Sequence, residues 1–535
     1  MKLAHRLYHL ARADFYERVR RHGFFVALLA CVYGGYAFLP PNGSKYMTMS
    51  MDSHRGIYNS AWIGSAVAML AGAFVSLIGF YIVKNAVERD RRTGVGQILA
   101  TTPISKLQYT IGKTFSNFTV LAAMTAVVAL ACVVMQFVRG EDHALNLWQL
   151  LGPFVLLTLP VLLMVSAIAV FFETMPILRG GIGNVAFVFI WGALLGANFG
   201  HKQTQVYNDP LGTGIVLPDM LRACAAQIPG FDPVKAGVSM GVNIQTEAVK
   251  LTTFTWSGIH WNMHHVMWRL QWVLLALGIA AVSAIPFDRF DSAGSVLKLP
   301  KTRKRRKPTA EIAPVSGFSV GDVHLTPLDH AASGKRPGAM VLAMVFAEWK
   351  LIVRGLRWWY AGPLGLTIAA CTAPLSSVRA IILPLAWFWP VLQWAKLGTR
   401  EAQHNTEPVF FSAPHPLSRQ LAATWIAGVM LSVMTGFAIA LRLMITGDAH
   451  GLLAWGVGAL FAPALALALG VWTRSGKAFE AIYTGLCYAV IQQAAPLDFM
   501  GAVPTAPSNN PAIFSSLTLL FLLLALWGRQ RRLQN

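Results

Sequence analysis

The chain has 535 residues, of which 55% are hydrophobic and only 13% are charged, and its mean hydropathy is +0.51. This composition is too apolar for a soluble globular protein and is typical of integral membrane proteins. We interpret the formal net charge of +21 as charge that faces anionic lipid, and we expect no nucleic-acid partner.

Apolar stretches that could each form a membrane-spanning helix of about 20 residues follow one another along the chain. In the first half they are Phe24–Leu39, Ala61–Val83, Tyr109–Val138, Leu147–Phe172, Ile182–Phe199 and Met267–Pro286. In the second half they are Trp358–Leu375, Ala380–Ala395, Leu421–Ile445, Leu452–Trp472, Phe479–Ala494 and Ile513–Trp527. We therefore predict an all-α, polytopic membrane protein of about twelve transmembrane helices in two tandem six-helix units.

Basic residues indicate the orientation. Lys and Arg gather in residues 1–23, 84–106, 298–307 and 529–532, whereas the alternate loops are mixed or nearly neutral. Because basic loops stay on the cytoplasmic side, we expect both termini in the cytoplasm and the chain in the plasma membrane of a bacterium. Segment 288–338 is basic and contains proline, so it is predicted to be a cytoplasmic linker between a first unit, 1–287, and a second unit, 339–535.

A short polar motif occurs twice, between two apolar stretches each time. Its first copy is Glu88, Thr93, Pro103, Ile104, Ser105 and Lys106, and its second is Glu401, Thr406, Pro416, Leu417, Ser418 and Arg419, at a constant offset of 313 positions. Each copy is preceded by a charged amphipathic segment, around 14–21 and 348–357. This pattern indicates a duplicated membrane unit. The polar stretches 41–60 and 200–266, expected on the outer side, have no counterpart in the second half.

The stretch from Glu88 to Lys113 resembles the loop between the second and third spans of ABC-2 type permeases, the membrane subunits of ATP-driven exporters. Six spans per unit, an amphipathic N-terminal elbow segment and an outer loop before the sixth span are similar to that family too. In the second copy, Glu407 and Ile426 stand at the positions of Gly94 and Lys113. The resemblance implies two cytoplasmic ABC ATPase subunits as partners, with ATP and Mg bound there, and an exported substrate that the sequence does not identify.

The family resemblance implies that the motif residues couple the permease to the ATPases. A Glu with neighbouring Arg offers ion pairs, Thr93 and Gly94 make a break and a cap, and Pro103 fixes the exit from the short helix. The alternative is that these are ordinary loop and anchor residues. The coupling candidates are Glu88, Arg89, Thr93, Gly94, Pro103, Ser105, Glu401, Thr406, Pro416 and Ser418.

The chain is not expected to be an enzyme. Its nearest match to a phosphate-binding loop, Gly112-Lys113-Thr114, has Leu107 where such a loop needs a glycine. We interpret Lys113 instead as a lysine that extends toward the headgroups from an apolar helix. ATP hydrolysis is therefore assigned to separate subunits, and no cofactor to this chain.

A secondary transporter is a rival class. Such proteins generally keep carboxylates inside the membrane at a cost of roughly 3 kcal/mol each, whereas Glu173 and Glu480 lie only at the ends of predicted spans. The ATP-driven class is therefore favoured. Its pathway is predicted between the two halves, where candidate lining residues are Asn117, Gln136, Gln393, Gln492 and Gln493, although polar residues in spans also join helices by hydrogen bonds.

Two outer clusters contain soft or imidazole ligands. Met47, Met49, Met51 and His54 form one, and His260 and His264, expected on one helical face, form the other. Such groups suit copper or zinc, but they are also ordinary residues of an interfacial amphipathic segment. Copper handling or metal-centre maturation is therefore an alternative function, and ATPase-linked mechanotransmission without transport is another.

Overall fold

The computed structural model describes residues 2–20, 22–41, 43–196, 209–244, 251–290, 337–354, 357–403, 406, 419–491 and 494–534. The described chain is mostly helical. In the first half its helices are α1 (Lys2–Val19), α2 (His22–Ala37), α3 (Ser60–Val83), α4 (Ala86–Arg92), α5 (Val95–Thr101), α6 (Lys106–Arg139), α7 (Leu147–Pro153), the π-helical turn η1 (Phe154–Thr158), α8 (Leu159–Thr174), α9 (Gly181–Gly196), α10 (Thr213–Gln227) and α11 (Met263–Val282).

The second half is also helical. Its elements are α13 (Pro337–Val353), η4 (Arg357–Tyr360), α14 (Ala361–Thr372), α15 (Leu375–Ser377), η5 (Val378–Ile382), α16 (Leu383–Phe388), α17 (Val391–Trp394), α18 (Arg400–Gln403), α20 (Leu421–Ile445), α21 (Ala449–Thr473), α22 (Lys477–Ile491), η7 (Ala495–Leu497) and α23 (Asn510–Gln534).

Eight helical segments of the described chain are long and apolar enough to cross a membrane. They are Ser60–Arg92, Lys106–Arg139, Leu147–Thr174, Met263–Val282, Leu375–Trp394, Leu421–Ile445, Ala449–Thr473 and Asn510–Arg532. The other four predicted spans fall on α2, α9, α14 and α22, which have only 12 to 16 residues. An α-helix rises about 1.5 Å per residue, so these four helices are shorter than the hydrocarbon core of about 30 Å. The count of twelve transmembrane helices therefore stays a prediction.

Polar side chains determine where several long helices begin. The side chains of Asn59, Ser105, Asn262 and Asp448 each accept a hydrogen bond from the backbone N–H three residues later. These contacts satisfy backbone donors that have no partner within the helix. At Ser105 the bond is reciprocated by Gln108, which completes a capping box.

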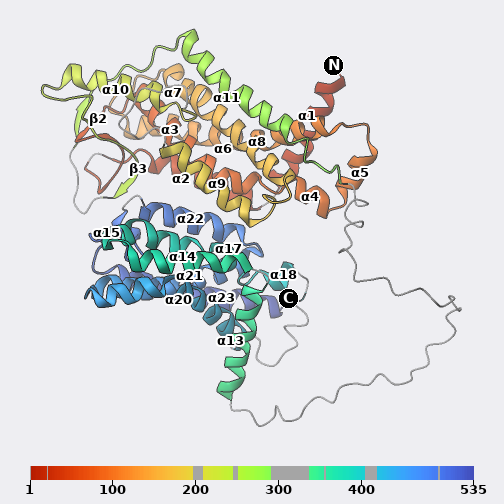
Figure 1. Ribbon diagram of the computed structural model, residues 1–535. Coiled ribbons are helices and arrows are strands. Elements are labelled where there is room, and N and C mark those ends of the chain that lie inside the picture. Colours follow the sequence, from red (N-terminus) through yellow and green to blue (C-terminus); the bar gives the residue numbers. More distant parts are fainter. Residues whose placement is uncertain are drawn as a thin grey trace.

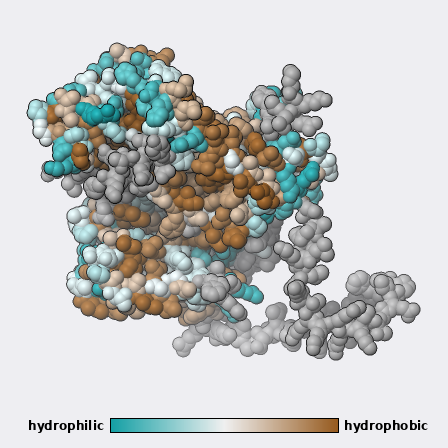
Figure 2. Space-filling model, turned by 45° about the horizontal axis from the view of Figure 1, so that its top comes forward, coloured by the Kyte–Doolittle hydropathy of each residue, from teal (hydrophilic) through white to brown (hydrophobic). Residues whose placement is uncertain are grey.

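The two halves lie side by side, with α4, α5 and α18 toward one end and the strands toward the other (Figure 1). Hydrophobic side chains gather over the middle of the first half, and hydrophilic ones gather near its two ends (Figure 2). Helix α11 belongs to this apolar surface, since only 17% of its most apolar stretch is buried. This distribution is compatible with insertion into a membrane.

The prediction of an all-α chain missed a small sheet. Strands β1 (Tyr46–Met51), β2 (His54–Gly56), β3 (Val238–Ile244) and β4 (Thr252–Phe254) form it in the order β3-β1-β2-β4. The pairs β1–β2 and β1–β3 are antiparallel, and β2–β4 is parallel. The sheet therefore joins the two polar segments that the second half lacks.

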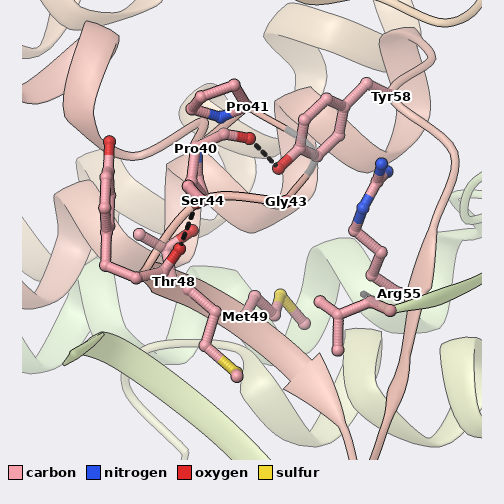
Figure 3. Close-up of a pocket in the computed structure, with 11 residues that line it drawn as sticks. Pro40, Pro41, Gly43, Ser44, Thr48, Met49, Arg55 and Tyr58 are labelled. Atoms are coloured by element: carbon pink, nitrogen blue, oxygen red, sulfur yellow. Dashed lines mark hydrogen bonds between the residues drawn. The ribbon is translucent and has the colours of Figure 1, made fainter. Parts of the chain in front are cut away.

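A polar joint fastens this sheet to the helices. Arg55 holds the carboxylate of Glu141 with both terminal nitrogens, at 2.9 and 2.6 Å, and lies over the ring of Tyr58. The Tyr58 hydroxyl donates to the carbonyl of Pro40 at 2.8 Å (Figure 3). The neighbouring cavity measures about 20 Å³, room for about one water molecule. We therefore assign this region a structural role.

Buried apolar residues fall into two large clusters. One extends from Phe24 to Ala280 and the other from Ile352 to Ala525. Aromatic contacts join the halves, with Trp191 of α9 meeting Tyr488 of α22 at 4.8 Å between ring centroids. The helices α9 and α22 therefore bring the two halves together.

The charge pattern makes a testable prediction about orientation. Ser53, beside the sheet, and Gln97, on α5, are both exposed and lie at opposite ends of the first half. In a Cys371→Ser background, which removes the exposed native cysteine, we expect an impermeant thiol reagent to label Ser53→Cys on intact cells and Gln97→Cys only after lysis. Labelling of Gln97→Cys on intact cells would show that the protein has the opposite orientation.

Candidate functional site

Helices α4 and α5 form a short hairpin-like segment at the end opposite the sheet. It is separated from α3 by Asn85 and divided by Gly94, whose φ angles of 85° and 77° are left-handed. The hydroxyl of Thr93 donates to the carbonyl of Arg89 and closes α4. The expected break at Thr93 and Gly94 is therefore present, and a side chain at position 94 would be strained.

Glu173, at the end of α8, holds the start of α4. Its Oε1 accepts the backbone N–H groups of Asn85 and Ala86 at 2.6 and 3.0 Å, and its Oε2 accepts those of Val87 and Glu88 at 2.7 and 3.1 Å. The side chain is only 1% exposed. Four donors at a helix N-terminus are a strong match for one carboxylate, so Glu173 is a structural clamp.

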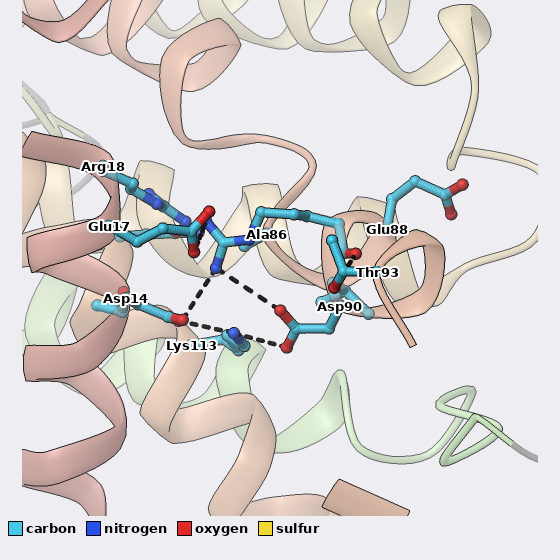
Figure 4. A network of polar contacts seen from close by, with 12 residues as sticks. Asp14, Glu17, Arg18, Ala86, Glu88, Asp90, Thr93 and Lys113 are labelled. Atoms are coloured by element: carbon cyan, nitrogen blue, oxygen red, sulfur yellow. Dashed lines mark hydrogen bonds and ion pairs between the residues drawn. The ribbon is translucent and has the colours of Figure 1, made fainter. Parts of the chain in front are cut away.

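An ion-pair network fixes α4 to α1 and α6 (Figure 4). Lys113 of α6 lies 2.7 Å from a carboxylate oxygen of both Asp14 and Asp90. Arg89 contacts Asp14 at 2.9 Å and Glu17 at 3.2 Å. The interpretation of Lys113 as a lysine that reaches the headgroups is wrong, because its side chain is 1% exposed and pairs with two buried carboxylates.

Aromatic packing positions α5. Gly96 lies against Phe290, so close that a Cβ atom at position 96 would come within 2.5 Å of the ring. Phe290 in turn packs on Tyr109 and Phe287. The outer face of α5 leaves Val95 and Ile98 exposed by 43% and 68%. A rigidly held helix thus presents apolar side chains beyond the end of the spans.

The second copy of the motif lies in a related network. Arg400 of α18 contacts Glu348 of α13 at 3.5 Å, and Glu401 contacts Arg529 of α23 at 3.0 Å. In both halves, therefore, an acidic residue of the preceding amphipathic helix pairs with an arginine next to the motif glutamate, Arg89 after Glu88 and Arg400 before Glu401. Thr406 is described, and its N–H donates to the carbonyl of Glu401. Pro416 and Ser418 lie outside the described residues.

The two motif glutamates already have partners within the chain. Glu88 points away from the network of Figure 4 and lies 3.1 Å from Arg92 and 3.6 Å from Arg91. Glu401 is less accessible, with 12% of its side chain exposed. Contact of either residue with an ATPase stays a prediction. Pro103 and Ser105 link α5 to α6, where Ser105 caps the helix.

The predicted pathway residues do not form one lining in the described chain. Asn117 and Gln136 are both buried on α6, about 28 Å apart along its axis. Asn117 accepts from Arg18, and Gln136 bonds with Ser60. Gln393 is buried on α17 in the second half. Gln492 and Gln493 lie outside the described residues, so a shared pathway stays a prediction.

The metal candidates are dispersed over the end of the first half that carries the sheet. Met47, Met49 and Met51 alternate along β1, and Met51 pairs with His54 of β2, but Met49 and Met51 are buried in the first apolar cluster. The expectation of one helical face for His260 and His264 is wrong, because α11 begins only at Met263. Within the described ranges no group of three His, Cys, Asp or Glu could hold a metal ion.

Several residues that build this site were not predicted as such. Asp14, Asp90 and Glu173 become important only through partners far along the chain. One local signal was available, since Ser105 followed by Gln108 is the pattern of a capping box. Lys113 in an apolar helix was a second signal, because a buried cation requires a partner.

Comparison with family models, with curated proteins and with solved structures finds no match to this chain. The eight long apolar helices define its class, a helical polytopic protein compatible with integral insertion into a membrane. Any narrower assignment depends on the geometry at the α4–α5 end.

Proposed function

We propose that the chain is the permease of an ATP-driven exporter in a bacterial plasma membrane, made of two fused six-helix units and driven by two separate ATPase subunits. The observation that carries this proposal is the α4–α5 segment, which is anchored by buried ion pairs and exposes Val95 and Ile98. Exposed apolar side chains on a rigid element are typical of a protein contact.

The anchoring supplies a route for force. Movement of α5 would be transmitted through Gly96 and Phe290 to the α6–α11 end, through Lys113 to α1, and through Glu173 to α8. These contacts are buried and several are charge-assisted, which makes them stiff. The related Glu348–Arg400 pair gives the second half a similar connection.

A matched pair of substitutions tests the docking surface. Ile98→Asp places a charge in the apolar contact and is expected to lower association with the ATPase by at least tenfold, whereas folding is unaffected because the side chain is 68% exposed. Val234→Asp is the control, since Val234 is 85% exposed near the sheet. Association is measured by co-purification from native membranes with two ATPase copies per permease.

Two outcomes would contradict the proposal. One is an unchanged ATPase content in the Ile98→Asp preparation, and the other is equal loss in both variants. Inverted vesicles then separate transport from mechanotransmission. ATP-dependent accumulation of a compound in vesicles that contain the wild-type protein, absent with Ile98→Asp, supports export, and tight ATPase coupling without any accumulation supports mechanotransmission.

A further inference from the structure

A cavity of about 540 Å³ lies where the two halves meet, beside the start of α4. The first half contributes residues of α1, α2, α3, α4 and α6, and the second half contributes Ser475 and Lys477 from the turn that leads into α22. The cavity is far larger than a water site and lies in the range typical of ligand pockets, about 300–1,000 Å³.

The polar part of the lining is strongly basic. Arg18, Lys84, Arg89, Arg92 and Lys477 line the cavity, and Glu88 is the one carboxylate of the described lining. The acidic partners of the network, among them Asp14, Asp90 and Glu173, are not part of this lining. A molecule in the cavity would therefore meet a positive potential.

Two lysines matter most, because they belong to different halves. The Nζ atom of Lys477 donates to the backbone carbonyl of Lys84 at 2.9 Å. The Nζ atom of Lys84 bonds to Asn184 and to the carbonyls of Leu178 and Gly180. The three N–H groups of Lys84 are thus taken by these acceptors. Lys477 uses one N–H group and forms no ion pair with a carboxylate of the described chain, so it can still gain from an anion.

The remaining wall is apolar and belongs to helices of the first half. Phe24 of α2, Ile82 and Val83 of α3, and Val120 of α6 form it. A free inorganic anion would make no use of this surface. A molecule with a negative headgroup and an acyl chain would match both parts of the cavity.

We propose that this cavity binds the phosphate group of an anionic phospholipid at Lys477 of the second half, in the positive potential of the first-half basic residues that line it, with its acyl chain along the apolar wall. The lipid would join the two halves at the α4 end. This inference does not depend on the proposed function, because a membrane protein of any activity could use such a lipid.

The charge on Lys477 gives the site a pH dependence. Burial lowers the pKa of Lys477 to about 8; Glu173 and Glu480 oppose this shift, whereas Lys84 and Arg18 add to it. Below that pH the ammonium group is charged and attracts phosphate, and above it the charge is lost. Lipid retention is therefore expected to fall between pH 7 and pH 9.

The test uses the full chain, purified without an ATPase, and native mass spectrometry with phosphatidylglycerol or phosphatidylcholine. We expect the wild type to retain one phosphatidylglycerol in preference to phosphatidylcholine. Lys477→Gln should weaken retention about ten- to a hundredfold, the range for loss of a hydrogen bond to a charged group. Lys477→Arg should keep it and weaken its pH dependence, because arginine stays charged.

A second variant separates loss of the lipid site from a folding defect of Lys477→Gln. Ser475→Asp adds a negative charge in the turn before α22, outside any helix, and should weaken retention to a similar extent. Inorganic phosphate provides the other arm. Displacement of phosphatidylglycerol only at high phosphate concentration supports a lipid site, whereas phosphate binding without any preference for phosphatidylglycerol overturns it. Equal lipid retention by the wild type and both charge variants would also overturn it.

Discussion

Replacing Lys113 with methionine is expected to release the α4–α5 segment from the helices that hold it. The substitution keeps the length and the apolar part of the side chain but leaves Asp14 and Asp90 facing each other, with 11% and 4% of their side chains exposed. Loss of one partner from a buried ion pair costs about 3–5 kcal/mol. We expect about 3 kcal/mol, because Arg89 still contacts both carboxylates.

The measurement is thermal unfolding in detergent together with hydrogen exchange of residues 86–101. Lys106→Met is the matched control, since Lys106 is exposed at the start of the same helix, and it should change stability by no more than about 0.5 kcal/mol. A Lys113→Met protein with wild-type exchange in α4 and α5 would show that the network does not position this segment.

Replacing Glu173 with glutamine is expected to loosen α4 alone. Glutamine has one acceptor oxygen, whereas Glu173 uses two to receive four backbone N–H groups. The side-chain NH₂ group of glutamine would also point its own N–H donors at the backbone N–H donors of α4. A buried donor without a partner costs about 1–3 kcal/mol, so we expect a local loss of about 2 kcal/mol, equivalent to about thirtyfold faster amide exchange in α4.

Glu141→Gln is the control for this local effect. Glu141 is also a hydrogen-bonded carboxylate, but it pairs with Arg55 beside the sheet at the other end of the first half. Its replacement should alter exchange near β2 and leave α4 unchanged. Equal exchange of α4 in the wild type and in Glu173→Gln would mean that the helix start is held by packing and not by the carboxylate.

The contacts that these two substitutions would remove lie around the first copy of the repeated motif. The sequence places Glu88 and Glu401 at equivalent positions, and both have partners within the chain. The more informative similarity is between the contacts Asp14–Arg89 and Glu348–Arg400, which in each half connect an amphipathic helix to an arginine next to the motif glutamate. A comparison of motif residues alone could not show this, because the paired residues lie 75 and 52 positions apart.

The sequence alone determined the features that depend on short windows of residues. The long apolar stretches predicted the eight long helices, because the bilayer sets the length of each span independently of its neighbours. Thr93 and Gly94 predicted the break between α4 and α5, because the preference of glycine for positive φ is local.

Only the tertiary structure decided which distant residues meet. The sheet pairs β1 with β3 across about 190 residues, and Lys113 finds Asp14 from 99 positions away. The cavity between Lys84 and Lys477 exists only because α22 packs against the first half. Strand pairing, buried charge pairs and interfaces depend on how whole helices pack, and no local pattern of side chains specifies that arrangement.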